Sequence, residues 1–524
     1  MRKKRLNKDE GQILIRCFLL AQHFQPYSQH FSFKVESSPR RLLVIGYGSV
    51  SQCALPLLID YFLLKKQINS ITIIDVIDQQ ARIEPYHKKY KQVTYQQEEV
   101  TEKNYENILS KYLSNGDILL DLAVNLETRC LLKWCHDHKV CFVNTSVELW
   151  EPFGEAYKND PRLLTLYHRQ MQLIEMQNDI KWNKNGPTAI LDHGCNPGLV
   201  SHFVKRALID MAQYILDHKK NLISIDERSK LQNALKIRNY PQLAYLLDIK
   251  TIHISERDTQ LTKDPKKVNE FVNTWSIDGL AEEGIAPAEM GWGTHEKIIP
   301  KGTFFHNEKT GPCNQVCLAT KGMNTWIRSW VPSGEIIGMV IRHGEAYGIS
   351  KYLTVYNNDE NNNDDNDKIA LYRPTVHYAY LPTDSTISSL VEFRMHDYKL
   401  QPKLRILNNE IIEGTDEVGV LLLGGRYVQA WWAGSVLDIH EARRLVPEQN
   451  ATTLQVAISV VAAINYCIKH PNEGICLPDD IDADEILNIC MPYLGQWVSK
   501  SADWPSEKDK IREGWQFTSF QVVD

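Results

Sequence analysis

Carboxylates and tryptophans share one segment of the sequence. Residues 268–296 contain six acids and no lysine or arginine, with Trp275, Trp292 and four glycines interleaved. The acids are Glu270, Asp278, Glu282, Glu283, Glu289 and Glu296. Tryptophan faces attract ammonium groups, and carboxylates hold them by charge-assisted hydrogen bonds. The segment therefore predicts one uncompensated carboxylate cluster in a pocket for an amine, where the alternative is a solvated acidic face.

Two further places supply groups suited to amine chemistry. Glu256 in ISERDTQ would add an anchor, unless it pairs with Arg257 beside it. His343 lies two residues from Glu345 after an apolar run, and on a strand positions two apart share a face. An amine must lose its proton before it gives up a hydride, and a group that titrates near neutrality suits that task. His343 is therefore a candidate proton shuttle; the alternative is a satisfied core histidine.

A glycine-rich turn follows the first strongly apolar run of the chain. RLLVIG leads through Gly46, Gly48, Ser49 and Val50 into a helix-like segment. In a GxGxxG turn the first glycine makes the bend, the second lets the backbone approach a pyrophosphate, and the helix N-terminus supplies N–H donors. Ser51 replaces the third glycine. The pattern predicts a dinucleotide site, where the alternative is an ordinary glycine turn.

The next strand ends in a carboxylate that bears on the choice of dinucleotide. Asp75 would accept hydrogen bonds from the adenosine ribose and would repel a 2′-phosphate, which favours NAD over NADP. Polar and small residues also follow two later strands, at the carboxyl edge where a dinucleotide lies in such sheets. They are Ala123, Val124, Asn125, Asn144 and Thr145, and for each the alternative is a turn residue.

Strands alternating with helices are needed to bring these groups together. Continuous apolar runs predict buried strands at 41–46, 70–76, 117–122, 139–144 and 189–193. The segments between them have helical character, including a helix at about 127–138 and a long polar one near 158–180. This order predicts an α/β protein with a Rossmann-type doubly wound parallel sheet. Short β-like segments from about 245 to 430 predict a second, mixed α+β domain, which we expect to bind the substrate.

We divide the chain into four parts. Residues 1–37 are expected to be a tail or a short surface helix, and 38–195 to be the NAD-binding Rossmann domain. Residues 196–430 are expected to be the substrate domain, in which the apolar-free stretch 357–367 is a mobile acidic loop. Residues 431–524 are expected to be helical, with the option of packing back on the Rossmann domain.

Composition excludes several classes of protein. The chain has 59 Lys+Arg against 65 Asp+Glu, a formal charge of -6 and a pI near 6.3, so a nucleic-acid partner has no electrostatic footprint. No run approaches the roughly 18 consecutive apolar residues of a membrane span. The 11 cysteines lack the paired spacing of a zinc site, so we expect no metal, and reduced thiols in a cytoplasmic protein.

Several segments carry a resemblance to a known family. They are LLVIGYGSVSQ, ILDHGCNPGLVSHF, ISERDTQ, NTWSIDGLAEEG, GWGTHEK, WIRSWVPSGE and VIRHGEAYGISKYLTV. Together they resemble the bacterial homospermidine synthases, within the wider saccharopine dehydrogenase-like group. The likeness extends over almost the whole chain after about residue 40. The PGL element is shared across the wider group, whereas TWSIDG, GWGTHEK and RHGEA in combination are specific.

The resemblance implies a reaction that leaves the cofactor unchanged overall. Two putrescine molecules would be joined into homospermidine with loss of ammonia. NAD would take a hydride from one putrescine, the second diamine would attack the resulting imine or its aldehyde, and the same NADH would reduce the new Schiff base. Spermidine and diaminopropane are further candidate substrates. The resemblance also implies a homodimer.

The resemblance assigns roles to particular residues. Trp275 would hold a substrate or imine by a cation–π contact, and Glu283 would fix the distal ammonium. Glu256 and Asn196 would line the reaction centre, with Asn196 and Pro197 near the nicotinamide. His343 and Glu345 would complete the polar end. Two positions depart from the family pattern: Asn144 stands where an Asp is expected, and Cys195 where a smaller residue is usual.

Two rival functions were weighed against this one. A saccharopine or carboxynorspermidine dehydrogenase-like reductase would need cationic groups for substrate carboxylates, and the absence of Lys and Arg from 268–296 argues against it. A non-catalytic NAD-binding protein would leave the pocket of Trp and Glu unexplained.

Overall fold

The computed structural model describes residues 40–152, 160–182, 185–306, 315–357 and 370–522. The predicted N-terminal tail, and the acidic loop apart from its first residue, lie outside these ranges. All described residues belong to one contact unit, Pro39–Asp524.

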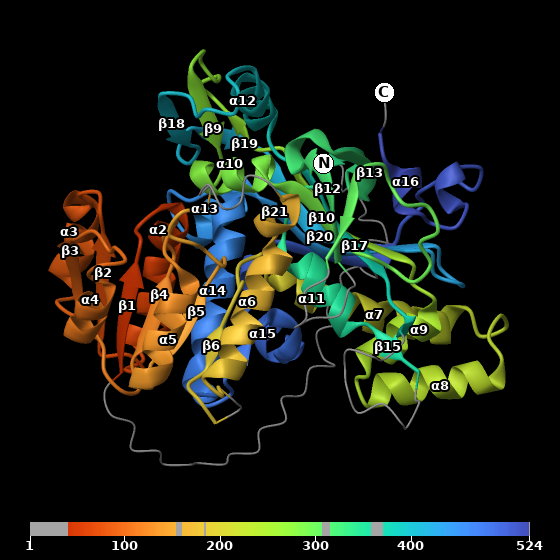
Figure 1. Ribbon diagram of the computed structural model, residues 1–524, viewed down its shortest axis with the longest axis horizontal. Coiled ribbons are helices and arrows are strands. Elements are labelled where there is room, and N and C mark those ends of the chain that lie inside the picture. The colour runs from red at the N-terminus through yellow and green to blue at the C-terminus, as the bar shows by residue number, and fades with distance from the viewer. Residues whose placement is uncertain (1–39, 153–159, 183–184, 307–314, 358–369, 523–524) are drawn as a thin grey trace, which may run out of the picture. The chain divides into compact units, whose positions relative to one another are not determined.

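A seven-stranded parallel sheet carries the glycine turn (Figure 1). Its strand order is β22-β6-β5-β4-β1-β2-β3, and every neighbouring pair is parallel. The strands are β1 (Arg41–Ile45), β2 (Ser70–Asp75), β3 (Val93–Gln97), β4 (Ile118–Asp121), β5 (Cys141–Asn144), β6 (Ala189–Ile190) and β22 (Ile475–Cys476). The order from β3 to β6 is that of a Rossmann sheet, so the predicted fold class is confirmed.

Two strands of this sheet were not predicted. β3 has the sequence VTYQQ and lies at one edge, where it needs less apolar surface than a central strand. β22 has two residues and comes from far along the chain, because it pairs with β6 at the other edge. Neither strand has the long apolar run on which the other predictions depend.

Helices cover both faces of the parallel sheet. Successive side chains of a strand point to opposite faces. Leu42 and Val44 share a core cluster with α2 (Ser49–Leu58) and α14 (Ala451–Lys469), whereas Leu43 and Ile45 share another with α4 (Tyr105–Tyr112) and α5 (Thr128–His138). The remaining helices between its strands are α3 (Gln80–Lys89) and α6 (Leu166–Asp179). The sheet is therefore doubly wound, with helices packed on each of its faces.

A mixed ten-stranded sheet forms the second layer of structure, as expected for the substrate part. Its path is β11-β12-β10-β17-β7-β20-β21-β23, with the hairpin β13–β14 attached through β17. The strands are β7 (Thr251–Asp258), β10 (Pro287–Gly291), β11 (Thr303–Phe305), β12 (Gln315–Lys321), β13 (Trp326–Val331), β14 (Gly334–Met339), β17 (Thr375–Leu381), β20 (Thr415–Leu423), β21 (Ala430–Asp438) and β23 (Gln496–Ser501). Only β17 and β7 run parallel within this path, and both contribute to the site described below.

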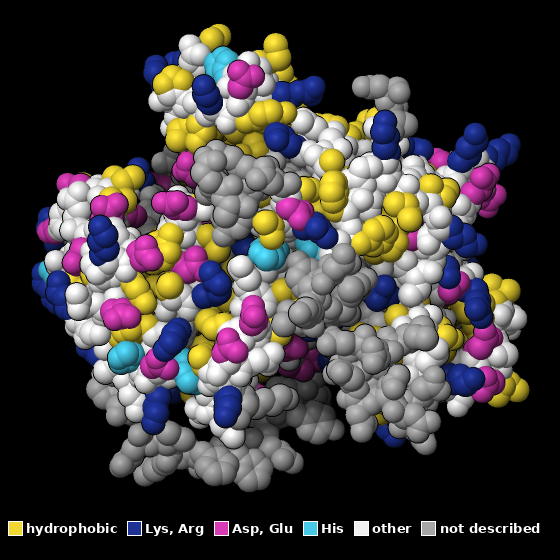
Figure 2. All heavy atoms as spheres, viewed as in Figure 1, with side chains coloured by type: hydrophobic (Ala, Val, Ile, Leu, Met, Phe, Trp, Pro, Cys, Tyr) yellow, Lys and Arg dark blue, Asp and Glu magenta, His cyan; other side chains and the backbone are white. Residues whose placement is uncertain are grey.

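Further elements surround this sheet. The helices are α7 (Leu199–His218), α8 (Ile225–Lys236), α9 (Tyr240–Leu247), α10 (Ile277–Ile285), α11 (Gly344–Tyr352), α12 (Asp384–Met395), α13 (Ile439–Leu445), α15 (Ala483–Cys490) and α16 (Phe517–Phe520). The short strands are β8 (Leu261–Thr262), β9 (Glu270–Asn273), β15 (Val355–Tyr356), β16 (Ala370–Tyr372), β18 (Lys403–Ile406) and β19 (Ile411–Glu413). On the face shown in Figure 2, Lys and Arg side chains are interspersed with Asp and Glu.

The segment 431–524 contains strands as well as helices, and it returns to the parallel sheet. In Figure 1 the blue α14 lies beside the orange N-terminal strands, and it packs against α2 and β5. α14 contains several polar residues, but by length and mean composition it is apolar enough to cross a membrane. However, 83% of its apolar window is buried inside the structure, and a core helix of a soluble protein passes the same test.

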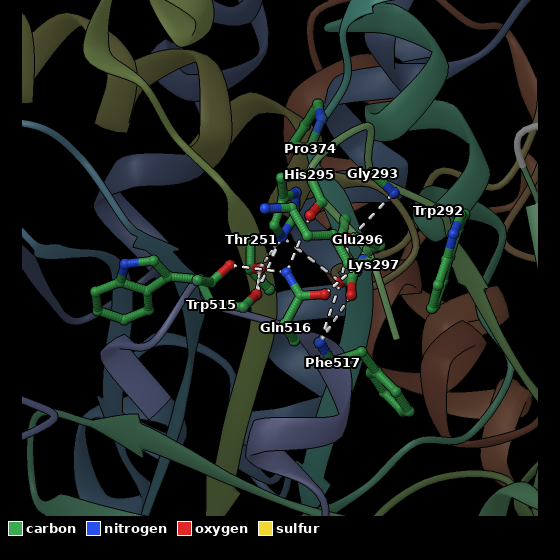
Figure 3. Close-up of polar contacts among 12 residues, drawn as sticks. Thr251, Trp292, Gly293, His295, Glu296, Lys297, Pro374, Trp515, Gln516 and Phe517 are labelled. Atoms are coloured by element: carbon green, nitrogen blue, oxygen red, sulfur yellow. Dashed lines mark hydrogen bonds and ion pairs between the residues drawn. The ribbon is translucent and has the colours of Figure 1, made fainter. Parts of the chain in front are cut away.

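The GWGTHEK motif contacts residues 515–517, near the C-terminus (Figure 3). The Glu296 carboxylate accepts hydrogen bonds from the Thr375 hydroxyl at 2.7 Å and from Phe517 N at 3.1 Å. Gln516 Nε2 donates to the carbonyl of His295 at 3.0 Å, and Lys297 N donates to Gln516 Oε1 at 2.6 Å. Burial raises the pKa of Glu296 to about 7, although the hydrogen bonds from Thr375 and Phe517 act to lower it. The motif therefore fastens residues 515–517 to the second sheet.

Glu296→Ala should reduce the free energy of unfolding by about 1–3 kcal/mol, because it leaves the Thr375 and Phe517 donors without their acceptor. Chemical denaturation measures the change. The matched control is Glu413→Ala, which removes an exposed carboxylate and should change stability by less than about 0.5 kcal/mol. Equal effects of the two substitutions would contradict this role for Glu296.

Candidate active site

One pocket of about 160 Å³ joins the two sheets. Its first wall comes from the parallel sheet: the start of α2 and the segments that follow β4, β5 and β6. Its second wall comes from β7, β17, α10 and the residues that precede α11, and α14 closes the base. The carboxyl ends of parallel strands are where such sheets bind ligands.

Most of the predicted site residues meet in this pocket. Those that line it are Val50, Ala123, Val124, Thr145, Asn196, Pro197, Glu256, Trp275, Glu283 and His343. Glu345 lies behind His343 and lines a neighbouring cavity. Gly46, Gly48, Ser49, Asp75, Asn125 and Asn144 are not among the lining residues. The pocket thus unites the predicted reaction centre with one end of the predicted dinucleotide site.

The glycine turn has the geometry that a pyrophosphate requires. Gly46 has φ +88°, and a Cβ there would lie 2.8 Å from the carbonyl oxygen of Leu122. The helix α2 begins at Ser49, and no side chain caps it at Gly48. Its first N–H groups are therefore available to an anion. These observations fit a dinucleotide bound across the turn.

Asp75 ends β2 next to this turn. Its carboxylate accepts hydrogen bonds from Tyr47 N at 2.5 Å and from Ile77 N at 2.7 Å. The side chain is therefore held in place beside the glycine turn and remains partly exposed. This is the position from which a carboxylate would reach a ribose hydroxyl.

Asn144 and Asn125 occupy different surroundings. Asn144 is buried and joins the ends of β5 and β6, because its Oδ1 accepts from Asp192 N at 3.0 Å and its Nδ2 donates to the carbonyl of Ser146 at 2.5 Å. Asn125 is exposed with φ +59°, a left-handed conformation that asparagine adopts in turns.

A hydrogen-bonded triad forms the deep end of the pocket. Asn196 Nδ2 donates to Glu256 Oε2 at 2.5 Å and also to the Tyr378 hydroxyl, which itself donates to the same oxygen of Glu256. Burial raises the pKa of Glu256 to about 7, although the hydrogen bonds from Tyr378 and Asn196 act in the opposite direction. Glu256 is thus a buried carboxyl group that changes protonation near neutral pH. A group with this property can take part in proton transfer.

A hydrogen bond at one edge of its indole ring orients Trp275. Its indole Nε1 donates to the Tyr380 hydroxyl at 3.1 Å, and the Tyr380 ring stacks on Tyr378 with 5.3 Å between centroids. The indole is half-buried and lines the pocket. A tryptophan held in this way offers an aromatic surface to a cation in the pocket.

His343 is held between two carboxylates. Its Nδ1 lies 3.1 Å from Glu345 Oε1, and its Nε2 lies 3.3 Å from Glu283 Oε2. Burial alone would lower the pKa of His343, but attraction to Glu345 and Glu283 and hydrogen bonds to both raise it well above its usual value. The imidazole is therefore a cation at neutral pH in this arrangement, which corrects the expectation that it titrates near neutrality.

The prediction that His343 and Glu345 lie on a strand is also wrong. β14 ends at Met339, and His343 is the residue that precedes helix α11, with Glu345 in its first turn. The two side chains still meet, because the chain turns into the helix between them. An acid in the first turn also suits the positive end of a helix.

The six acids of the segment 268–296 do not form one uncompensated cluster, which corrects that expectation. Glu282 is paired with Arg169 at 2.6 Å and with Arg342, and these arginines hold its pKa below the usual range despite burial. Glu270 pairs with Arg405 on another element at 2.9 Å. Glu289 accepts hydrogen bonds from backbone N–H groups of α6, and Glu296 binds residue 517 near the C-terminus. Asp278 is exposed to solvent. Trp292, the second tryptophan of the segment, packs beside Phe305. Of the six acids, only Glu282 and Glu283 line the pocket.

A cation does line the pocket, which corrects the expectation that a lack of cations excludes a carboxylate-binding reductase. Arg342 lines the pocket although residues 268–296 contain no cation, because it comes from a distant part of the chain. Its guanidinium is engaged with Glu282 and with the carbonyl of Leu164. The cations of the pocket alone therefore do not exclude a carboxylate-binding reductase.

Sequence reasoning missed several residues of the pocket. Tyr378 lines the pocket and Tyr380 supports Trp275 behind it, but both have the sequence context of ordinary residues of β17. Asp192 follows β6 at the carboxyl edge, a position that could have flagged it. Thr452 and Val456 come from α14, whose apolar pattern indicates only a buried helix.

Two family models match consecutive parts of the chain. The saccharopine dehydrogenase NADP binding domain matches residues 42–190, and the saccharopine dehydrogenase C-terminal domain matches residues 194–502. The boundary between them falls between β6 and α7. The parallel sheet with its glycine turn therefore corresponds to the first model.

Individual proteins match almost the whole chain. The homospermidine synthase of Mesorhizobium japonicum is 34% identical over 496 residues, which cover 92% of this chain and 96% of that protein. The homospermidine synthase of Blastochloris viridis is 34% identical over 500 residues, covering 92% and 97%. The crystal structure of the homospermidine synthase of Legionella pneumophila in complex with NAD matches with a TM-score of 0.76 at 33% identity, covering 92% of this chain and 98% of that one. The chain therefore belongs to the homospermidine synthase family.

Proposed function

We propose that the protein is an NAD-dependent homospermidine synthase that joins two putrescine molecules with release of ammonia. The observation that carries this proposal is the single pocket in which Trp275, Glu283 and Glu256 face the carboxyl edge of the dinucleotide-type sheet. The likeness in sequence to two homospermidine synthases over more than nine-tenths of their length supports it. The two family models bear the name of saccharopine dehydrogenase, the carboxylated-product rival, but the individual proteins that match more than nine-tenths of this chain are homospermidine synthases.

Bound NAD supplies a hydride acceptor that becomes the hydride donor later in the same cycle. The glycine turn and the start of α2 would hold the pyrophosphate, and Asp75 would hold the adenosine ribose. Val50, Ala123, Val124, Thr145 and Pro197 line the pocket on this side and would flank the nicotinamide end. The likeness to a Legionella structure in complex with NAD supports this choice of cofactor.

The other wall binds the two ends of a diamine. Glu283 is one-fifth exposed, and of the two carboxylates of α10 that line the pocket it is the one without an arginine among the contacts of the described residues, so it would take the distal ammonium. The face of Trp275 would stabilise the same positive charge. The near amine would then lie by Asn196 and Glu256, in a site dry enough to strengthen each of these interactions.

Glu256 is the group we assign to proton transfer at the near amine. An amine must be neutral before it loses a hydride, and the carboxylate form of Glu256 can accept its proton. Its pKa of about 7 makes this form abundant at neutral pH and scarce in acid. His343 has the complementary role of a cation that balances Glu283 and Glu345 while no substrate is bound. Substrate that pairs with Glu283 would weaken the hold on the imidazolium proton and would allow His343 to release it.

Three finer points belong to the same proposal and are supported by the family resemblance. We place the enzyme in the cytoplasm, as a homodimer. Putrescine is the expected substrate, and spermidine or diaminopropane would enter the same pocket because they share the pair of terminal amines. A shorter diamine would bridge the distance from Glu283 to Glu256 less well.

Purified protein supplied with putrescine and a trace of NAD should form homospermidine and ammonia without net accumulation of NADH. The reason is that each hydride taken from putrescine returns to the Schiff base in the same pocket. Mass spectrometry of the products together with absorbance at the NADH wavelength measures both quantities. Steady NADH formation without any triamine would contradict the proposal.

NADP should activate the cofactor-free enzyme poorly, and Asp75→Asn should narrow the gap between NADP and NAD. The carboxylate of Asp75 repels a 2′-phosphate, and the substitution removes that repulsion. The measurement is the half-saturating concentration of each dinucleotide. Asp78→Asn is the matched control, because Asp78 is an exposed acid three residues further on and should leave the preference unchanged. Equal activation of the unaltered protein by both dinucleotides would refute the assignment.

A further inference from the structure

A second, smaller cavity adjoins the active-site pocket. Asp192 and Pro197 line both, and His343 of the pocket contacts Glu345 of the cavity. Its volume is about 10 Å³, which is room for about one water-sized particle. On the side away from the pocket it reaches Asp479, whose neighbour Asp480 is exposed. The cavity therefore extends from the edge of the pocket to a buried aspartate whose neighbour in the sequence lies on the surface.

The polar atoms around this cavity are mainly oxygen acceptors. Glu345 Oε2 and Gln170 Oε1 are buried, and neither has a hydrogen-bond partner within the described part of the chain. The orientation of Gln170 is set by its Nε2, which donates to Asp192 Oδ2 at 3.3 Å. Its amide oxygen is thus left to face the cavity. The Ser201 hydroxyl also borders the cavity, but one hydroxyl donates only one hydrogen bond, so at least one of these two buried acceptors calls for a donor from outside the chain.

Helix α11 makes room for the acids through two glycines. A Cβ at Gly344 would lie 2.7 Å from Asp192 Oδ2, and one at Gly348 would lie 2.5 Å from Asp479 Oδ2. Residues four apart share one face of a helix, so the side-chain-free face of α11 is the floor on which the two carboxylates rest. The glycines of the RHGEAYG segment therefore have a use that packing of apolar side chains does not explain.

Two cations are near the cavity, and both are engaged elsewhere. Lys205 Nζ donates to the backbone carbonyls of Asp479 and Ile481, at 2.8 Å each. His343 faces Glu345 Oε1 and Glu283. Burial raises the pKa of both Asp192 and Asp479 to about 7, so each changes charge near neutral pH. Three carboxyl groups thus surround a space without a cation inside it.

We propose that this cavity binds the ammonium ion released by the reaction and passes it toward the surface; the inference rests on the proposed function. Ammonium is about the size of water, carries positive charge and offers four N–H donors, which matches a space bordered by carboxylate and amide oxygens. Water has two donors and no charge. A larger organic amine exceeds the volume.

The reaction supplies this ion with atoms and charges in balance. The ammonium end of the second diamine first gives up one proton and then attacks the protonated imine of the first as a neutral amine, so that a new C–N bond forms and the C–N bond to the leaving nitrogen breaks. The attacking nitrogen gives up a second proton in the exchange, and the leaving nitrogen takes up both protons and departs as ammonium. The products are a protonated Schiff base and ammonium, and the cavity begins one side chain away from this step.

Ammonium should inhibit homospermidine formation as a product, and Asp479→Asn should raise its inhibition constant about tenfold, because a charge-assisted hydrogen bond is lost. Initial rates are measured by mass spectrometry with increasing ammonium chloride at an ionic strength held constant with sodium chloride. Tetramethylammonium, which is too large for the cavity, should inhibit no more than sodium. Asp480→Asn is the matched control, because it removes the adjacent exposed charge and should leave the constant unchanged.

Gly348→Ala is the second variant, since its methyl group would lie 2.5 Å from Asp479 Oδ2 and would displace that carboxylate without removing its charge. It should raise the inhibition constant as well, and thermal unfolding shows whether either variant is folded. Equal constants for the Asp479 and Asp480 variants, or equal inhibition by tetramethylammonium, would overturn the inference. An altered pH profile with an unaltered ammonium constant would instead identify a water on a proton path. Failure of the unaltered protein to make homospermidine would refute the proposed function, whereas a normal yield with unaltered ammonium constants refutes only this site.

Discussion

A buried imidazolium between two carboxylates organises the whole candidate site. His343 joins Glu283 on α10 to Glu345 on α11, so the two helices that bring negative charge to the pocket are held by one cation. Without that cation, the acids would face one another in a medium of low dielectric constant, where like charges repel strongly. A diammonium substrate can take over part of this balancing role. Binding of substrate and release of a proton from His343 are therefore linked through the same carboxylate.

The arginines divide the acids of the pocket into two kinds. Arg169 and Arg342 neutralise Glu282, which becomes part of the support for α6, α10 and the chain before α11. Glu283 is the next residue of the same helix and points elsewhere, so it remains available for a ligand. The acids around the small cavity beyond Glu345 belong to the second kind. They border an open space, whereas Glu282 contacts arginines. Glu282 is therefore compensated by arginines at a position of support, whereas Glu283 is balanced by His343 and can exchange that partner for a ligand.

Local signals predicted the glycine turn and the five central strands of the parallel sheet. The apolar run 41–46, the glycine turn and Asp75 follow one another within a short stretch, and each has a direct physical reason in a βαβ unit. Trp275 and Glu283 were also found, because an acid beside a tryptophan is informative about an amine. β3 and β22 were missed since an edge strand and a two-residue strand need no apolar run.

Long-range pairing accounts for the remaining errors. Arg342 meets Glu282 across 60 residues of sequence, and Tyr378 meets Glu256 across 122, so composition within 268–296 could not reveal which acids were neutralised. The GWGTHEK motif was informative about the family, but Glu296 serves the attachment of residues 515–517 and not the pocket. His343 was placed on a strand because the apolar run before it continues nearly to the helix start.

The central claim is that Glu283 recognises the distal ammonium of a diamine. It is tested most directly by comparing the binding of putrescine and 1-aminobutane, which differ by that one ammonium group, to the NAD complex of the unaltered protein and of Glu283→Gln. The account predicts that the unaltered protein prefers putrescine by about tenfold or more, as expected for a charge-assisted contact, and that the variant loses most of this preference. A preference that survives the substitution would contradict the account.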